Sequence, residues 1–315
     1  MPSAWSRRSF LAMTAAAATA VAGCGKDEPG AVAKDGSVTV AHVFGETRIP
    51  APPTRVVSAG LTEQDDLLAV GVVPIAVTAW FGDQPFGVWP WARGKLGAAQ
   101  PAVLSLADGI QVDAIAALRP DLIVATNAGL DADTYTRLSQ IAPTVAQSAP
   151  AAFFEPWKDQ ATVIGQAAFQ AEEMSRLIDD VEQRFASVAT DNPGFAGKKA
   201  MLLSGTLSGD GVHATPPGWQ TDFLTSMGFT VPDVPDTVPR DRLAAVLRGA
   251  DVLIWTTESD AEQAAVLADP VIATLPPGRN VFTGKDLAGA IAFASPLSYP
   301  LVADALPPLL SRALR

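Results

Sequence analysis

The sequence predicts an α/β protein with two Rossmann-like lobes, each built on a central, mostly parallel sheet, joined by one long α-helix, with a ligand cleft between the lobes. Three observations lead to this prediction. Short apolar runs alternate with helical patterns in both halves of the chain, which is typical of parallel sheets covered by helices. Between the halves, residues 171–189 form one amphipathic pattern. Each half also carries a similar stretch, DAIAALRPDLIVAT from Asp113 and DRLAAVLRGADVLIWT from Asp241.

The segment 171–189 is the predicted linker helix. Its apolar residues recur every three or four positions and therefore share one face; they are Met174, Leu177, Ile178, Val181, Phe185 and Val188. On the opposite face we expect the i,i+4 pairs Glu172–Arg176 and Asp180–Arg184. A helix of this length spans roughly 30 Å and, without Pro or Gly, bends little. The lobes should therefore be largely preset and close by a small rotation.

Composition excludes several classes of function. A chain of 315 residues with 48% hydrophobic content can bury two cores, and a net charge of −11 argues against nucleic acid or an anionic membrane surface as a partner. One Cys and two His permit neither an internal disulfide nor a three-histidine metal site. The chain lacks G-x-S-x-G and H-E-x-x-H, so an extracytoplasmic hydrolase is disfavoured.

The N-terminus has the pattern of an export and anchoring signal. Arg7 and Arg8 precede Phe-Leu and a short apolar run, which resembles a twin-arginine signal over residues 1–23. The following VAGC resembles a lipoprotein box, which would make Cys24 the lipidated N-terminus of the mature chain. Residues 24–36, polar and containing Pro and Gly, form the predicted tether. We expect an exported protein held on the outer face of the cell membrane by its lipid alone.

The remaining chain divides into a first lobe (37–152), a helical linker region (153–193) and a second lobe (194–315). In the first lobe the predicted strands are 37–44 with a return toward Ile49, 55–58, 72–78, 122–125 and 144–146, and the predicted helices are 62–70, 113–118 and 135–141. In the second lobe the predicted strands are 198–204 and 252–255, and the predicted helices are 221–227, 241–246 and a C-terminal helix from Ser295 to near Leu314.

A family resemblance covers nearly the whole chain after the tether. The stretches that carry it are FGETRIPAPPTRVVSAG from Phe44, TEQDDLLAVGVVP from Thr62, LRPDLIVA from Leu118, YTRLSQIAPTV from Tyr135 and WKDQATVIGQAA from Trp157. Together they resemble the ferric-siderophore branch of the lipoprotein solute-binding proteins of ATP-driven (ABC) importers. The resemblance implies a monomeric binding protein, not an enzyme, that captures an iron(III)–siderophore complex and delivers it to an ABC permease dimer. It implies no cofactor and no protein-bound metal, because the chelator holds the iron.

The predicted ligand site lies beyond the carboxyl ends of the strands. An aromatic loop at residues 79–91 contains Trp80, Trp89 and Trp91 with Phe81 and Phe86, and such rings offer stacking faces to a large chelate. The alternative is that these rings pack as a loop core. Trp255 and Trp219 are the candidates from the second lobe, although Trp219 fits a core position equally well. His213 is a further candidate in a Gly/Pro-rich loop, where an exposed histidine without a role is the simpler interpretation.

Four more residues complete the predicted ligand site: Glu63, Asp108, Asn127 and Arg240. Hydroxamate-binding relatives carry a basic residue just before the helix that Asp113 opens, whereas this chain has Ala107 and Asp108. An anionic chelate would meet repulsion there. Arg240, Arg93 or Lys95 could supply positive charge, or could be solvated surface residues. Haem and cobalamin therefore stay open as ligands, as does an envelope scaffold that no longer transports.

Asp113 and Asp241 are the predicted permease contacts. In relatives each lobe presents an acid, usually Glu, at the start of this short helix to arginines of a symmetric permease dimer. Two matched lobes meeting two matched subunits explains the internal repeat. The alternative is that each Asp is an ordinary helix N-cap.

Overall fold

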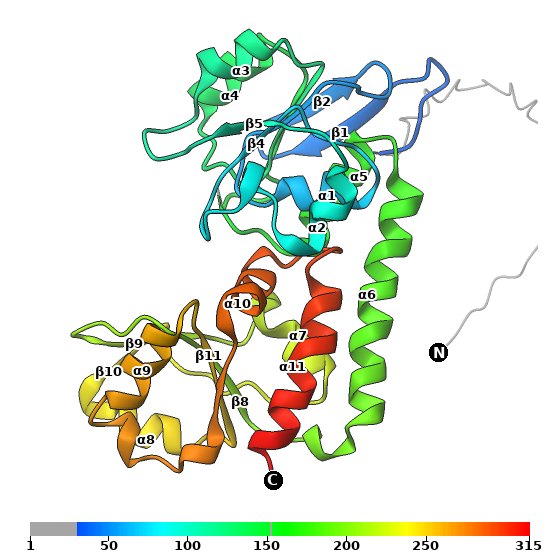
Figure 1. The fold of residues 1–315 in the computed structure, drawn as a ribbon. Coiled ribbons are helices and arrows are strands. Elements are labelled where there is room, and N and C mark those ends of the chain that lie inside the picture. The colour runs from blue at the N-terminus through cyan, green and yellow to red at the C-terminus, as the bar shows by residue number, and fades with distance from the viewer. Residues whose placement is uncertain (1–29, 152) are drawn as a thin grey trace, which may run out of the picture.

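The computed structural model describes residues 30–151 and 153–315, which form two α/β lobes stacked one above the other with one long helix along their side (Figure 1). The predicted signal peptide and Cys24 lie outside the described residues. Among the residues described, no helix combines the length and the apolar content that a membrane crossing requires.

The first lobe contains a hairpin and a parallel sheet. The hairpin pairs β1 (Val38–His42) with β2 (Gly45–Ile49). The sheet has the order β5-β4-β3-β6-β7, with β3 (Val56–Ser58), β4 (Ala76–Thr78), β5 (Ala102–Leu104), β6 (Leu122–Ala125) and β7 (Thr144–Ala146). Its helices are α1 (Glu63–Ala69), α2 (Pro90–Leu96), α3 (Val112–Leu118), α4 (Ala132–Ser139) and α5 (Trp157–Ala167). The central strands β3 and β6 are buried along their whole length, which explains their unbroken apolar runs.

The second lobe repeats this arrangement with one reversed strand. Its sheet has the order β10-β9-β8-β11-β12, with β8 (Ala200–Ser204), β9 (Gly211–Thr215), β10 (Thr237–Pro239), β11 (Val252–Thr256) and β12 (Asn280–Phe282). Strand β9 runs antiparallel to both of its neighbours. The helices are α7 (Asp222–Ser226), α8 (Arg240–Arg248), α9 (Asp260–Ala268), α10 (Gly284–Phe293) and α11 (Tyr299–Ala313).

Both five-stranded sheets have the strand order 3-2-1-4-5 when the five strands of each sheet are numbered along the chain, leaving out the β1–β2 hairpin. This order places the topological switch point, where ligands of such sheets bind, between β3 and β6 in one lobe and between β8 and β11 in the other. Helices α3 and α8 occupy equivalent positions, since each precedes the fourth strand of its sheet. The sequence echo between Asp113 and Asp241 therefore reflects a structural repeat.

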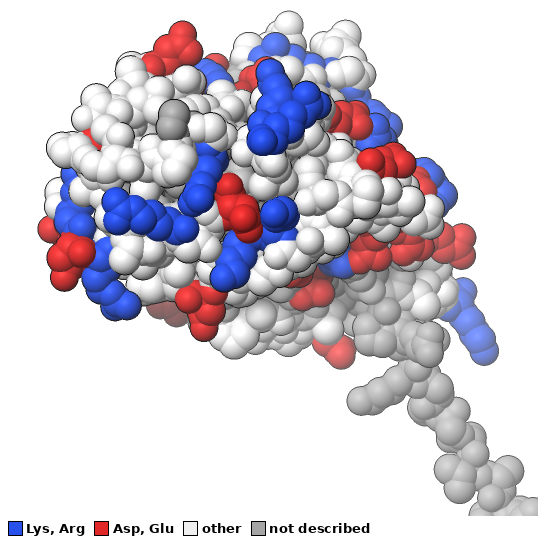
Figure 2. All heavy atoms as spheres, turned by 90° about the horizontal axis from the view of Figure 1, so that it is seen from below, with Lys and Arg blue, Asp and Glu red and all other residues white. Residues whose placement is uncertain are grey.

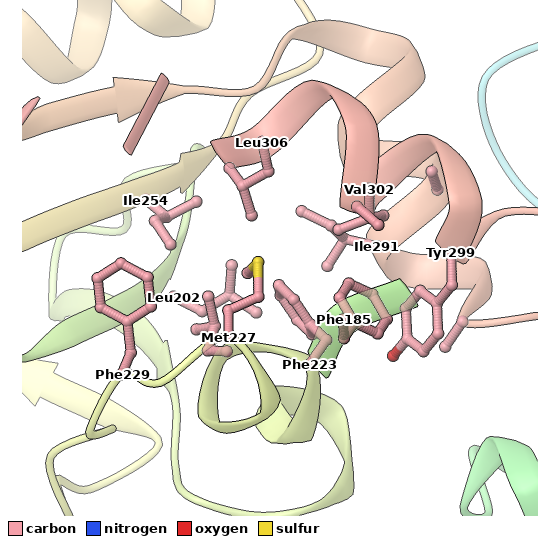
Figure 3. Packing of buried hydrophobic residues seen from close by; sticks show 14 of the residues in the cluster. Phe185, Leu202, Phe223, Met227, Phe229, Ile254, Ile291, Tyr299, Val302 and Leu306 are labelled. Atoms are coloured by element: carbon pink, nitrogen blue, oxygen red, sulfur yellow. The ribbon is translucent and has the colours of Figure 1, made fainter. Parts of the chain in front are cut away.

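The linker helix α6 spans Ala171–Asp191, two residues beyond the predicted end. Its buried face, which includes Met174, Val181 and Phe185, contacts α5 of the first lobe and α7 and α11 of the second. The same face brings Phe185 into the core of the second lobe (Figure 3). That core continues into the first lobe, because Trp157 of α5 lies edge-on to Tyr299 with ring centroids 5.3 Å apart. The lobes are thus in contact beside the linker.

The ion pairs predicted on α6 are wrong. Arg176 pairs with Glu173 at 2.6 Å and with Asp180 at 2.5 Å, and not with Glu172. Arg184 pairs with Asp304 of α11 at 2.8 Å, and not with Asp180. Helix α11 lies close enough for the long arginine side chain to reach across to it, which a one-helix pattern cannot reveal. This pair joins the linker helix to the second lobe.

The underside of the second lobe is electrostatically mixed. Figure 2 shows Lys and Arg interspersed with Asp and Glu over the face turned away from the first lobe. The net charge of −11 is therefore not concentrated on this face.

Candidate functional site

A cavity of about 640 Å³ lies at the carboxyl ends of β8 and β11, the topological switch point of the second lobe. Ser204 and Thr256, the last residues of these strands, line it. Residues of β9, the loop before α7, α10 and the loop after β11 complete the wall, together with Asp236 just before β10 and Phe81 from the first lobe. A volume of this size suits a small-molecule ligand.

The cavity combines an apolar wall with a polar rim. The apolar side chains are Phe81, Leu202, Leu203, Ala214, Pro216, Trp219, Ala288, Ile291 and Ala292. The polar side chains are Ser204, His213, Thr215, Gln220, Asp236, Thr256 and Glu258. Along β9, His213 and Thr215 share one face, whereas Ala214, which also lines the cavity, lies on the other face with Val212 and packs into the core.

The aromatic loop occupies a different position from the predicted one. Trp89 is 1% exposed and stacks on Trp91 with centroids 4.9 Å apart. Both rings pack against Phe293 of α10, at 6.0 and 5.7 Å, and Trp80 does so at 5.7 Å. These three tryptophans thus form an aromatic contact between the lobes, and none of them lines the cavity. The buried position of Trp89 corrects its predicted ligand contact, whereas Trp80 and Trp91 are partly exposed and their ligand contact stays a prediction.

A glycine makes this contact possible. A Cβ atom on Gly289 of α10 would lie 2.6 Å from the Trp89 ring, well inside van der Waals contact. Helix α10 can therefore approach the aromatic loop only because this position has no side chain.

The placement of Trp255 beside the cleft is also wrong. Its side chain is fully buried in the core of the second lobe, with Leu243 and Leu253, and its indole NH donates to Asn280 Oδ1 at 2.8 Å. The side chains on β11 alternate, and Trp255 takes the face opposite to that of Ile254. A residue at the end of a strand does not have to face the ligand.

Two predicted residues do line the cavity. Trp219 is half-buried in its wall, at the start of the turn before α7. His213 lies on strand β9 and not in the predicted loop, because β9 pairs with β10 over Thr237–Pro239. Its Nδ1 lies 3.1 Å from the carbonyl oxygen of Asp236.

Glu63 and Asn127 are buried structural groups at the corresponding end of the first sheet. Glu63 Oε1 accepts a hydrogen bond of 2.8 Å from the backbone N–H of Asn127. The side-chain Nδ2 of Asn127 donates to Thr62 Oγ1 at 3.0 Å. Burial raises the pKa of Glu63 to about 7, although the hydrogen bond from Asn127 lowers it. The nearest cavity, beside Asn127, measures about 10 Å³, hardly room for one water molecule. Their predicted contact with ligand is therefore corrected.

The remaining charged candidates lie outside the cavity. Asp108 is exposed in the loop before α3. Arg240, at the start of α8, forms an ion pair with Asp269 at 2.6 Å. Arg93 donates to Gln84 Oε1 at 2.6 Å, and Lys95 is exposed on α2. None of these side chains lines the cavity.

Asp113 and Asp241 occupy equivalent positions at the second residue of α3 and α8. Both are exposed, and the N-caps of the two helices are Gln111 and Pro239, so neither Asp is an N-cap. Within the described part of the chain, neither side chain forms a hydrogen bond or ion pair that would hold it to its own lobe.

Three carboxylic acids are buried on α1 beside the lobe contact: Glu63, Asp65 and Asp66. Asp65 Oδ2 accepts hydrogen bonds of 2.7 Å from Trp91 Nε1 and from the Ser295 hydroxyl of the second lobe. Burial raises the pKa of Asp65 to about 6 even though these two hydrogen bonds lower it. Burial raises the pKa of Asp66 well above its ordinary value, and the charges of Asp65 and Glu63 add to the effect.

The sequence interpretation missed most of the cavity wall. Thr256 and Glu258 lie within three residues of the end of the predicted strand 252–255. The rule that ligands bind at the carboxyl ends of strands could therefore have selected them. Helix α10 could not be found this way, because GKDLAGAIAF has no clear polar face. Across residues 30–151 and 153–315, no group of three or more His, Cys, Asp or Glu is placed to hold a metal ion.

Comparison with known proteins places the chain in a family. Residues 56–282 match the periplasmic binding protein family. The chain belongs to this family. Its members are solute-binding proteins of ABC transporters and not enzymes.

Among curated proteins, the chain is 29% identical over 200 residues to the probable siderophore-binding lipoprotein YfiY of Bacillus subtilis (strain 168), covering 62% of this chain and 58% of YfiY. It is 27% identical over 196 residues to the Fe(3+) dicitrate-binding periplasmic protein FecB of Escherichia coli (strain K12), covering 62% of this chain and 63% of FecB. The matched segment thus spans about three fifths of each relative.

A solved structure matches a larger share of this chain than these two curated proteins do. The periplasmic solute binding protein of Mycobacterium smegmatis is 70% identical, with a TM-score of 0.88 over 89% of this chain and 100% of that one. Two α/β lobes joined by one helix are therefore the architecture of this periplasmic binding protein.

Proposed function

We propose that this protein is an extracytoplasmic lipoprotein that captures an iron(III)–siderophore complex and delivers it to an ABC permease. The cavity at the ends of β8 and β11 is the observation that carries the proposal. It lies at a switch point, has the volume of a small-molecule site and presents both an apolar wall and a polar rim. The names of YfiY and FecB, which refer to a siderophore and to a ferric chelate, support the ligand class.

Delivery and location belong to the same proposal. Asp113 and Asp241 are exposed at equivalent positions of the two lobes, which fits a partner with two matched subunits. The twin-arginine pattern and the VAGC box before Cys24 support export and lipid anchoring.

Fluorescence of Trp219 tests binding directly. Because this ring lines the cavity, a ferric chelate that absorbs light should quench its emission saturably and raise the melting temperature of the protein. Trp219→Phe should reduce the quenching more than Trp157→Phe, because Trp157 lies in the core and does not line the cavity. Iron-free chelator should have a smaller effect. The proposal fails if hydroxamate, catecholate and citrate ferric chelates all leave emission and melting temperature unchanged at tens of micromolar.

A further inference from the structure

The charge of the cavity wall restricts the ligand further than its shape does. Two carboxylates, Asp236 and Glu258, lie on the polar rim, and no Lys or Arg is among the lining residues. In the described chain neither carboxylate forms an ion pair or a side-chain hydrogen bond. Both are therefore available to a ligand.

Lys285 and Arg240, two basic side chains of the second lobe, do not line the cavity. Lys285, on the first turn of α10, lowers the pKa of Glu258, but burial and the charge of Glu262 raise that pKa more strongly. Lys285 itself is exposed and does not line the cavity. Arg240 is paired with Asp269.

The first lobe adds no compensating charge to the wall. Its contribution is the apolar ring of Phe81. The first-lobe arginine nearest in sequence to this ring, Arg93, is directed to Gln84 and the carbonyl of Val88. A ligand here meets acidic groups contributed by the second lobe and an aromatic ring contributed by the first.

We propose that the cavity takes a ferric chelate of neutral or positive net charge, with a cationic group of the chelate placed at Asp236 or at Glu258. This inference rests on the proposed function and selects within its ligand class. An anionic chelate would bring like charges together, and the two exposed carboxylates would repel it most strongly at low salt. An ammonium group of the chelate would instead gain from whichever carboxylate it approaches, since β9 and β8 separate β10, which follows Asp236, from β11, which precedes Glu258.

Chelates that differ only in charge test the proposal. Ferrioxamine B carries a free ammonium group, and its N-acetylated form is neutral with the same iron coordination. Ferrichrome adds a second neutral chelate, and ferric dicitrate, ferric enterobactin and haem are anionic. Dissociation constants would be measured by calorimetry for the wild type, for Asp236→Asn with Glu258→Gln, and for Asp233→Asn. Asp233 is an exposed acid on the same connection but outside the cavity, which makes it a matched control.

The wild type should bind neutral or cationic chelates and prefer ferrioxamine B to its acetylated form by about fivefold at low salt, as expected for one ligand charge near one carboxylate. The double variant should lose this preference, the control should keep it, and high salt should reduce it. Tightest binding of an anionic chelate, or an order of affinity that the double variant leaves unchanged, overturns the charge inference while the proposed function stands. Absence of binding by every chelate overturns both.

Discussion

Asp65 of α1 accepts a 2.7 Å hydrogen bond from the hydroxyl of Ser295, a residue 230 positions later in the chain and in the other lobe. The same carboxylate oxygen accepts the Trp91 indole NH, while Asp65 Oδ1 is buried without a partner. One oxygen thus connects the first helix of the first lobe, the aromatic loop and the segment before α11.

This geometry separates the charge of Asp65 from its role as an acceptor. Asp65→Asn can keep an oxygen at the Oδ2 position, so we expect both hydrogen bonds and the melting temperature at neutral pH to be retained. Asp65→Leu leaves the Trp91 and Ser295 donors unpaired, at about 1–3 kcal/mol for each buried group. Chemical denaturation measures the difference, and faster hydrogen exchange around residues 293–298 should accompany it. Equal loss in both variants would show that the charge itself matters.

The raised pKa of Glu63 predicts how stability depends on pH. The pKa of Glu63 is about 7 in the folded protein, against an ordinary value of 4.5. The protonated form of Glu63 therefore stabilises the folded state relative to the ionised form. Its contribution is therefore present below about pH 4.5 and is lost as the pH rises through 7. The loss is on the order of 3 kcal/mol. Glu63→Gln should make the unfolding free energy fall less steeply between pH 5 and 8, with the raised pKa values of Asp65 and Asp66 keeping part of the slope. Urea denaturation would show this, and the same slope in both proteins would refute the assignment.

Phe293 should contribute strongly to stability because it is buried among three tryptophans of the other lobe. Phe293→Ala should cost about 3–5 kcal/mol of unfolding free energy. It should also loosen the lobes, which a larger radius of gyration in solution scattering would reveal. Phe86→Ala is the matched control, since this ring of the aromatic loop is 37% exposed and its removal should cost about 0.5 kcal/mol or less. Similar losses in the two variants would contradict the lobe contact.

Asp113→Asn combined with Asp241→Asn should abolish uptake in cells while ligand affinity and melting temperature stay unchanged, because both side chains are exposed and distant from the cavity wall. The controls are Asp133→Asn and Asp260→Asn, which alter exposed acids in the first turns of α4 and α9. Undiminished uptake in the first double variant would rule out docking through these residues.

Cys24→Ala should release the protein from membranes without changing its melting temperature, because the proposed acyl chains provide the anchor. Fractionation after a high-salt wash measures the release. A variant that stays with the membrane fraction would exclude lipidation at Cys24 as the anchor.

The elements that the sequence predicted well are those with strong local signals. Strands 122–125 and 144–146 coincide with β6 and β7 because short apolar runs between turns have few alternative structures. The contact of the aromatic loop with Phe293 could not be predicted, because Phe293 lies about 200 positions away. A local pattern cannot distinguish rings that contact a ligand from rings that contact the other lobe. His213 was placed in a loop because β9 is defined by pairing with β10, which is also a long-range contact.

The contact between Phe293 and the aromatic loop limits what a permease can detect about whether the binding protein carries a ligand. If the lobes already touch, the spacing between Asp113 and Asp241 changes little when a ligand binds. A permease that recognised only this spacing would accept empty and loaded protein almost equally. Empty protein would then act as a competitive inhibitor of import, and producing more of it than there is chelate to carry would slow uptake.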